Sequence, residues 1–163
     1  MITHVGIVGS EGLYWTKCQR DLATLKITEI LGEYTTPILV SGGCHKGGID
    51  IWAEDVARTL KINKYIFKPQ VFQWSSINTL DGKTLQGYKD RNIKIAEKSD
   101  IVYSIEPEYI DGITPWKNPV AFDWASNKFY RKSGGMWTMR YTRNVLRKEG
   151  KLVIIPREDE TDD

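Results

Sequence analysis

Four glycines interrupt the chain between residues 41 and 50, in the run Ser-Gly-Gly-Cys-His-Lys-Gly-Gly-Ile-Asp. The apolar residues 38–40 before this run have the character of a buried strand. After it, apolar residues recur at helical spacing at Ile49, Trp52, Ala53, Val56, Ala57 and Leu60. A helix that begins after glycines presents unpaired N–H groups and the positive end of its dipole. The run therefore predicts a loop that binds an anion such as phosphate, with a simple tight turn as the alternative.

Apolar runs alternate with amphipathic segments along the whole chain. Strands are expected at Val5–Val8, Ile38–Ser41, Tyr65–Phe67, Ile101–Ile105 and Lys151–Ile155. Helices are expected from Lys17 to Leu31 after a Thr16 cap, from Ile49, from Thr84 to Lys98, and from Gly134 to Lys148, with Gly150 ending the last one. Strands that alternate with helices pair in parallel through right-handed crossovers. This pattern predicts a three-layer α/β sandwich on a mainly parallel sheet of about five strands.

Three glycine segments fall at strand ends or helix starts, at residues 9–12, 42–48 and 134–135. Ligands of such sheets bind at the carboxyl ends of the strands. We therefore expect the three segments to converge on one edge of the sheet.

Residues 106–133 interrupt the alternation with three prolines and several aromatic residues. Loops of this length are commonly lids or binding elements, and Asp111-Gly112 is typical of a hairpin turn. The aromatic residues of the segment interleave with Lys117, Lys128, Arg131 and Lys132. This composition suits stacking on bases of single-stranded nucleic acid, a lid over a nucleotide, or a dimer contact. The acidic segment 158–163 is predicted to be disordered.

Composition limits the function classes. With 163 residues and 40% hydrophobic residues, the chain predicts one domain, residues 1–157. A net charge of +2 gives no overall attraction to nucleic acid or anionic membranes, and no apolar run has the length of a membrane span. The start at Met1 shows no secretory signal pattern, and two cysteines fit a reducing compartment. These features predict a cytoplasmic protein without membrane association, metal site or cofactor.

Four segments, taken together and in order, resemble the SLOG superfamily, a Rossmann-like group that includes LOG-type nucleotide phosphoribohydrolases and the DNA-processing protein A family. They are Val8-Gly-Ser10; Ser41-Gly-Gly43 with Gly47-Gly-Ile-Asp50; Arg91-Asn92 with Ala96 and Ser99-Asp100; and Gly134-Gly-Met-Trp-Thr138. The resemblance implies a Rossmann-like fold and a nucleotide or nucleotide-derived ligand, with its phosphate on the glycine loops. This sequence departs from the motif of the LOG hydrolases at Trp137, where they have glycine, and at Arg140-Tyr141, where they have carboxylates.

These arguments give a set of predicted ligand-binding residues: Gly9, Ser10, Gly42, Gly43, Lys46, Gly47, Gly48, Asp50, Arg91, Gly134, Gly135 and Thr138. Each has a structural alternative. Asp50 could be an N-cap, Lys46 a solvated loop lysine, and Arg91 a partner in a surface ion pair with Asp90 or Glu97. Ser10 could simply close its turn.

The leading functional hypothesis is a nucleotide-binding protein that forms homo-oligomers. The alternative is a nucleotide phosphoribohydrolase that cleaves an N-glycosidic bond, for which Glu11, Asp50 and Glu54 are the candidate carboxylates. A single-stranded DNA-binding module is the third hypothesis. Cys44-His45 is a poor nucleophile and base, because adjacent loop residues usually point apart.

Overall fold

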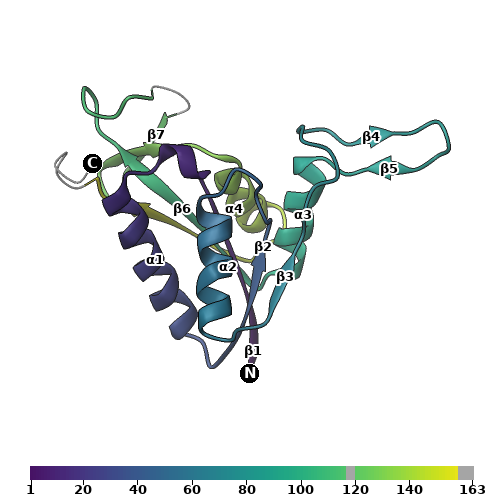
Figure 1. The fold of residues 1–163 in the computed structure, drawn as a ribbon, viewed down its shortest axis with the longest axis horizontal. Coiled ribbons are helices and arrows are strands. Elements are labelled where there is room, and N and C mark those ends of the chain that lie inside the picture. Colours follow the sequence, from purple (N-terminus) through teal and green to yellow (C-terminus); the bar gives the residue numbers. More distant parts are fainter. Residues whose placement is uncertain (117–119, 158–163) are drawn as a thin grey trace.

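A parallel sheet forms the centre of the molecule (Figure 1). The computed structural model describes residues 1–116 and 120–157. Within them, the parallel strands are β1 (Ile2–Gly9), β2 (Thr36–Ser41), β3 (Lys64–Ile66), β6 (Ile101–Tyr109) and β9 (Glu149–Ile155). Their spatial order is β3-β2-β1-β6-β9, and every neighbouring pair is parallel. This is the doubly wound order of Rossmann folds. The five predicted strands and the fold class are confirmed.

Two separate cores, one on each face of the sheet, make the three layers. On one face, α1 (Lys17–Gly32) and α2 (Ile49–Thr59) cover Val5, Ile7 and Leu39. On the other, α3 (Tyr88–Lys98) and α4 (Gly134–Asn144) cover Val8, Val40 and Val102. Because successive strand residues point to opposite faces, one apolar strand supplies both cores.

The first helix begins where its sequence predicts. Thr16 Oγ1 accepts a hydrogen bond from Gln19 N at 3.0 Å, and Gln19 Oε1 accepts one from Thr16 N at 3.3 Å, which completes a capping box. The short 3-10 helix η1 (Gly12–Tyr14) precedes it. None of the helices in residues 1–116 and 120–157 is long and apolar enough to cross a bilayer.

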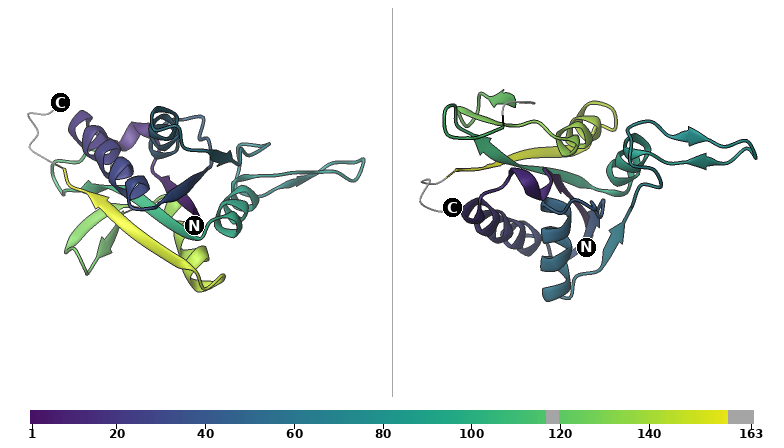
Figure 2. Two further views of the ribbon diagram at one scale, coloured as in Figure 1. Left: turned by 90° about the horizontal axis from the view of Figure 1, so that it is seen from below. Right: turned by 45° about the horizontal axis from the view of Figure 1, so that its top comes forward.

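The prediction that a helix begins at Thr84 is wrong, because the helix α3 begins at Tyr88. Thr84 and Leu85 form β5, which pairs with β4 (Ile77–Asn78) in a two-stranded arm, residues 70–87, that projects from the body (Figures 1 and 2). Gly87 has an extended backbone and is the N-cap of the helix. A side chain at Gly87 would lie within 2.8 Å of the carbonyl oxygens of residues 73–75, so glycine is required there. Asp81-Gly82 makes the turn of the arm, where Gly82 has a φ of +82°.

The last helix is shorter than predicted. It ends at Asn144, and Gly150 lies inside β9 instead of ending a helix. A Cβ at Gly150 would lie 2.9 Å from Met139 O and 2.6 Å from the Arg143 side chain. The glycine therefore lets α4 pass close to β9, a tertiary requirement that a single sequence does not reveal.

The segment 106–133 is more regular than expected. Residues 106–109 continue β6, and β7 (Val120–Asp123) and β8 (Lys128–Arg131) form an antiparallel hairpin that adds to the end of β6 (Figure 2). The hairpin therefore lies at residues 120–131, whereas Asp111-Gly112 makes only a turn. Lys117 and the predicted disordered tail 158–163 lie outside the described residues.

Candidate functional site

The three glycine segments meet at the carboxyl ends of β1 and β2. Gly12 N donates to Lys46 O at 3.3 Å, and Ile49 N donates to Ser10 O at 3.2 Å, so the first two loops contact each other. A Cβ on Gly135 would lie 2.6 Å from Gly9 N, which shows how closely α4 approaches β1. The predicted convergence on one edge is confirmed.

A cavity of about 560 Å³ opens at this meeting point. Its volume is typical of sites for small molecules. Its wall carries four cationic residues, Lys46, Arg91, Arg131 and Lys132, against two carboxylates, Glu11 and Asp50. Lys46 and Glu11 form an ion pair at 3.8 Å. The excess of positive charge favours an anionic ligand.

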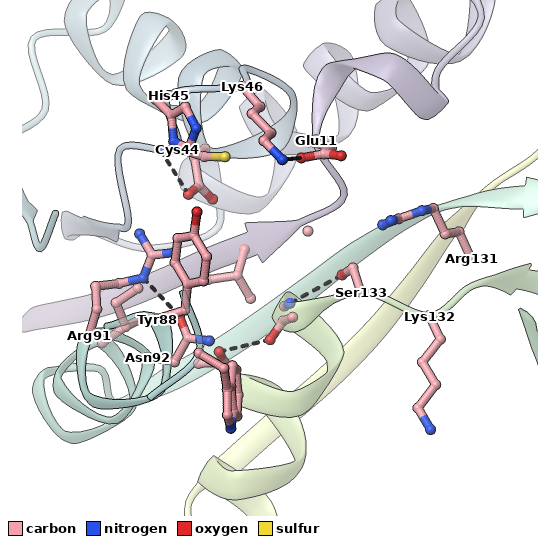
Figure 3. A pocket seen from close by; sticks show the side chains of 18 residues that line it. Glu11, Cys44, His45, Lys46, Tyr88, Arg91, Asn92, Arg131, Lys132 and Ser133 are labelled. Atoms are coloured by element: carbon pink, nitrogen blue, oxygen red, sulfur yellow. Dashed lines mark hydrogen bonds and ion pairs between the residues drawn. The ribbon is translucent and has the colours of Figure 1, made fainter. Parts of the chain in front are cut away.

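The cationic end of the cavity lies at the start of α4. Gly134 and Gly135 line it together with Arg131 and Lys132, and Ser133 caps the helix by accepting a hydrogen bond from Gly135 N at 3.1 Å (Figure 3). Within residues 1–116 and 120–157, neither Arg131 nor Lys132 has an ion-pair partner within 4 Å. The guanidinium carbon of Arg131 lies 3.4 Å from the centroid of the Tyr14 ring. Its buried Nε has no hydrogen-bond partner among the same residues.

A buried network of Arg91, Asp50 and Gly42 forms the opposite wall. Arg91 Nη1 donates to Gly42 O at 2.5 Å, and Arg91 Nε donates to Asn92 Oδ1 at 2.8 Å. Asp50 Oδ2 accepts a hydrogen bond from Cys44 N at 3.2 Å. Burial raises the pKa of Asp50 to about 6, against the opposing influence of the Arg91 charge. A Cβ at Gly42 would strike both side chains, so glycine is required there.

A second buried carboxylate, Glu106, lies beneath the site. Its Oε1 accepts from Ser10 Oγ at 2.6 Å, and its Oε2 accepts from Ser104 Oγ at 2.9 Å and also from Ser133 Oγ. Burial raises the pKa of Glu106 to about 7, although the three hydroxyl groups and the Arg131 charge oppose the shift. Glu106 thus joins the first glycine loop, β6 and the cap of α4.

Protonation of Glu106 should be visible in the stability of the protein. Since the folded-state pKa is raised from 4.5 to about 7, the folded protein binds the proton more tightly than the unfolded chain. Stability should therefore fall by about 3 kcal/mol as the pH rises from about 4.5 to about 7, and then stay level. Asp50 adds a similar fall that ends near pH 6.

Urea denaturation between pH 4.5 and 8.5 measures this dependence. Glu106→Gln should remove the slope between pH 6 and 7, because the amide does not titrate there. Glu97→Gln, at an exposed position of α3, should keep it. An unchanged slope in Glu106→Gln would refute the assignment.

The structure divides the predicted site residues into two groups. Those that line the cavity are Gly9, Lys46, Asp50, Arg91, Gly134, Gly135 and Thr138, with the candidate carboxylate Glu11. Those that are absent from its wall are Ser10, Gly42, Gly43, Gly47, Gly48 and the candidate carboxylate Glu54. Their side chains and backbone support the wall instead. Ser10 is buried against Glu106, and Glu54 accepts a hydrogen bond from Ser41 at 2.7 Å.

Three amides of the Gly42–Gly48 loop have partners within the protein. Gly43 N donates to Ser41 Oγ, Cys44 N to Asp50, and Gly47 N to Cys44 O. Gly48, with a φ of +83°, occupies the N-cap position of α2, so Asp50 is not the N-cap. Arg91 is buried in the first turn of α3 and makes no surface ion pair with Asp90 or Glu97 among the described residues.

Six polar or aromatic residues on the cavity wall lie outside the predicted site: Cys44, His45, Trp74, Tyr88, Asn92 and Ser133. Arg131 and Lys132 also line it, and the sequence singled them out only as basic residues of the segment 106–133. Ser133 directly before Gly134-Gly135 is a recognisable N-cap signal, whereas Trp74 reaches the site only through the fold of the arm. Burial raises the pKa of the Cys44 thiol, and the His45 ring stacks on Phe72 with ring centroids 4.1 Å apart, which disfavours a nucleophile and base pair.

Lys128, another basic residue of the segment 106–133, forms an ion pair with Glu108, with 3.3 Å between Nζ and Oε2. Residues 1–116 and 120–157 contain no cluster of three His, Cys, Asp or Glu that could hold a metal ion.

No family model matches this chain, and no curated protein matches it. Among solved structures, it is similar to the X-ray structure of TM1055, a target of the Northeast Structural Genomics Consortium, with 18% sequence identity and a TM-score of 0.47. The match covers 63% of this chain and 60% of that one, so it spans less than two thirds of the length of either protein. The strand order and the two cores themselves identify the fold as Rossmann-like.

Proposed function

We propose that this chain is a nucleotide-binding protein of the SLOG superfamily. The observation that carries the proposal is the cationic end of the cavity, where Arg131 and Lys132 flank the glycine pair at the start of α4. A helix N-terminus and the Arg131 guanidinium group, which has no ion-pair partner within residues 1–116 and 120–157, suit a phosphate group. The segments that resemble the superfamily supply residues from all four positions to this one cavity: Gly9, Asp50, Arg91 and Gly134.

Arg131 offers the clearest test, because Figure 3 shows its guanidinium group pointing toward the cavity, whereas the exposed side chain of Lys132 points away from it. Wild-type protein should be stabilised against heat by adenosine 5′-monophosphate, since a ligand that binds only the folded state raises the melting temperature. Arg131→Gln should weaken binding roughly tenfold by isothermal titration calorimetry, the size of one charge-assisted hydrogen bond. Lys26→Gln, on α1 beside Glu29, is the matched control and should bind normally. Equal affinities in the two variants would contradict the proposed phosphate position.

Cleavage of the nucleotide is a second candidate function, favoured by Asp50. Its carboxyl group lines the cavity and has a pKa raised to about 6, which suits a group that transfers a proton near neutral pH. Chromatography of the incubated mixture distinguishes the two functions. A binding protein leaves the nucleotide intact, whereas a hydrolase releases free base and ribose 5-phosphate and loses that activity in Asp50→Asn.

A further inference from the structure

Aromatic side chains also line the cavity. Trp74, Tyr88 and His45 all line it, and Figure 3 shows Tyr88 and Arg91 across the cavity from Arg131 and Lys132. Trp74 comes from the arm, and Tyr88 is the first residue of α3 directly after it. The cavity wall thus combines cationic side chains with aromatic rings, which suits a ligand that carries both an anionic group and a planar ring.

The backbone at the root of the arm, residues 72–76, is held in place by α3. Tyr88 N donates to Gln73 O at 2.8 Å, and Lys89 N donates to Trp74 O at 3.0 Å. Ser76 Oγ accepts from Gly87 N at 3.1 Å and donates to Asp90. These bonds satisfy donors at the start of α3 and fix the part of the arm that faces the cavity, although the rest projects into solvent.

The Trp74 ring is also fixed by its neighbours. It packs edge-on against Trp137 with ring centroids 5.0 Å apart, and Trp137 stacks on Tyr141 at 5.3 Å. On the other side of the arm, Phe72 stacks on His45 of the glycine loop. The root of the arm therefore spans the cavity from the glycine loop to α4.

Although these contacts hold Trp74 in position, 41% of its surface remains exposed to solvent. A tryptophan that is held in position while much of its surface stays open to solvent is prepared to stack on a ligand without further loss of side-chain entropy. Asn92 adds a polar group to the cavity wall. Its Oδ1 accepts a hydrogen bond from Arg91 Nε, and a Cβ at Gly134 would lie 3.8 Å from its Nδ2.

We propose that the root of the arm is the base-recognition subsite, in which Trp74 stacks on the base of the nucleotide and Tyr88 flanks it. This inference rests on the proposed nucleotide-binding function and adds the part of the ligand that phosphate contacts do not read. The arm lies between β3 and α3, so it elaborates a loop at the carboxyl edge of the sheet, where specificity commonly resides.

Isothermal titration calorimetry with adenosine 5′-monophosphate and ribose 5-phosphate tests the subsite, because only the first ligand carries a base. Trp74→Ala should weaken binding of the nucleotide roughly 5- to 150-fold, the range measured for one base stacked on an aromatic side chain, and should leave ribose 5-phosphate binding unchanged. Trp74→Phe should recover most of the loss. Trp124→Ala, at an 87% exposed tryptophan between β7 and β8, is the matched control and should change neither affinity.

Three results would overturn the inference. Equal weakening of both ligands in Trp74→Ala would mean that Trp74 only shapes the cavity. A wild-type protein that binds ribose 5-phosphate as tightly as the nucleotide would leave the phosphate site standing without a base subsite. A wild-type protein that binds neither ligand would refute the proposed function together with the subsite. Melting temperatures and near-UV circular dichroism of each variant separate these results from misfolding.

Discussion

Gly9→Ala should lower the free energy of unfolding by more than about 3 kcal/mol, the largest stability effect expected of a single methyl group here. The added carbon would overlap the carbonyl oxygen of Ile105 on the neighbouring strand and would lie 2.7 Å from Cγ1 of Ile49 on α2. Neither group has room to retreat, because β6 is paired on both sides and Ile49 is fully buried. Strand β1 would have to separate from β6 exactly where the cavity begins.

Gly32→Ala is the matched control for this prediction. Gly32 is the last residue of α1, and a Cβ there would meet nothing within 4 Å. Alanine is the better helix former, so stability should be unchanged or rise by up to about 1 kcal/mol. Urea denaturation of both variants measures the difference. Similar stabilities for the two would show that β1 and β6 do not approach each other as described.

Arg91→Met should cost about 3–5 kcal/mol, the usual consequence of removing one member of a buried charged network. Methionine keeps most of the apolar stem but leaves Gly42 O and Asn92 Oδ1 without their donor. It also removes the charge that holds down the pKa of Asp50. The Asp50 pKa should therefore rise further above 6, and the variant should be least stable, relative to wild type, at neutral and alkaline pH.

Arg58→Met provides the comparison for Arg91. Arg58 lies on α2, is mostly exposed, and pairs with Asp55 at 2.9 Å, so its loss should cost less than about 1 kcal/mol. The double variant Arg91→Met with Asp50→Asn should recover part of the stability of Arg91→Met, because it removes the unpaired buried carboxylate. If Arg91→Met were as stable as wild type at pH 8, the network would not contribute as proposed.

Local signals in the sequence were sufficient for the elements of the sheet. The strands β1, β2, β6 and β9 are apolar runs bounded by turn residues, and a strand buried on both faces must be apolar at successive positions. The helix α1 begins at a capping box that is readable from Thr16 and Gln19. Where several signals coincided, the predicted and observed elements agree.

The errors occur where a distant contact outweighs local preference. Thr84 and Leu85 have no helix-breaking neighbour before Gly87, and yet they form a strand because the arm pairs them with Ile77 and Asn78. Gly150 is typical of a helix end, but it serves the close approach of α4 to β9. Neither contact leaves a pattern within a short window of sequence.

Local patterns were enough to predict that three glycine segments end strands or begin helices, and a parallel sheet must bring such ends to one edge. The sequence also singled out Asp50, Arg91 and the pair Gly134-Gly135, which line one cavity. Three features became visible only in the folded chain. The four glycines of the Gly42–Gly48 loop are absent from the cavity wall, Glu106 is buried under three serine hydroxyl groups, and Trp74 lines the cavity from a projecting arm. The physical reason is that strand and helix formation follow from neighbouring residues, whereas burial, pKa and the direction of a side chain depend on residues that are far away in the chain.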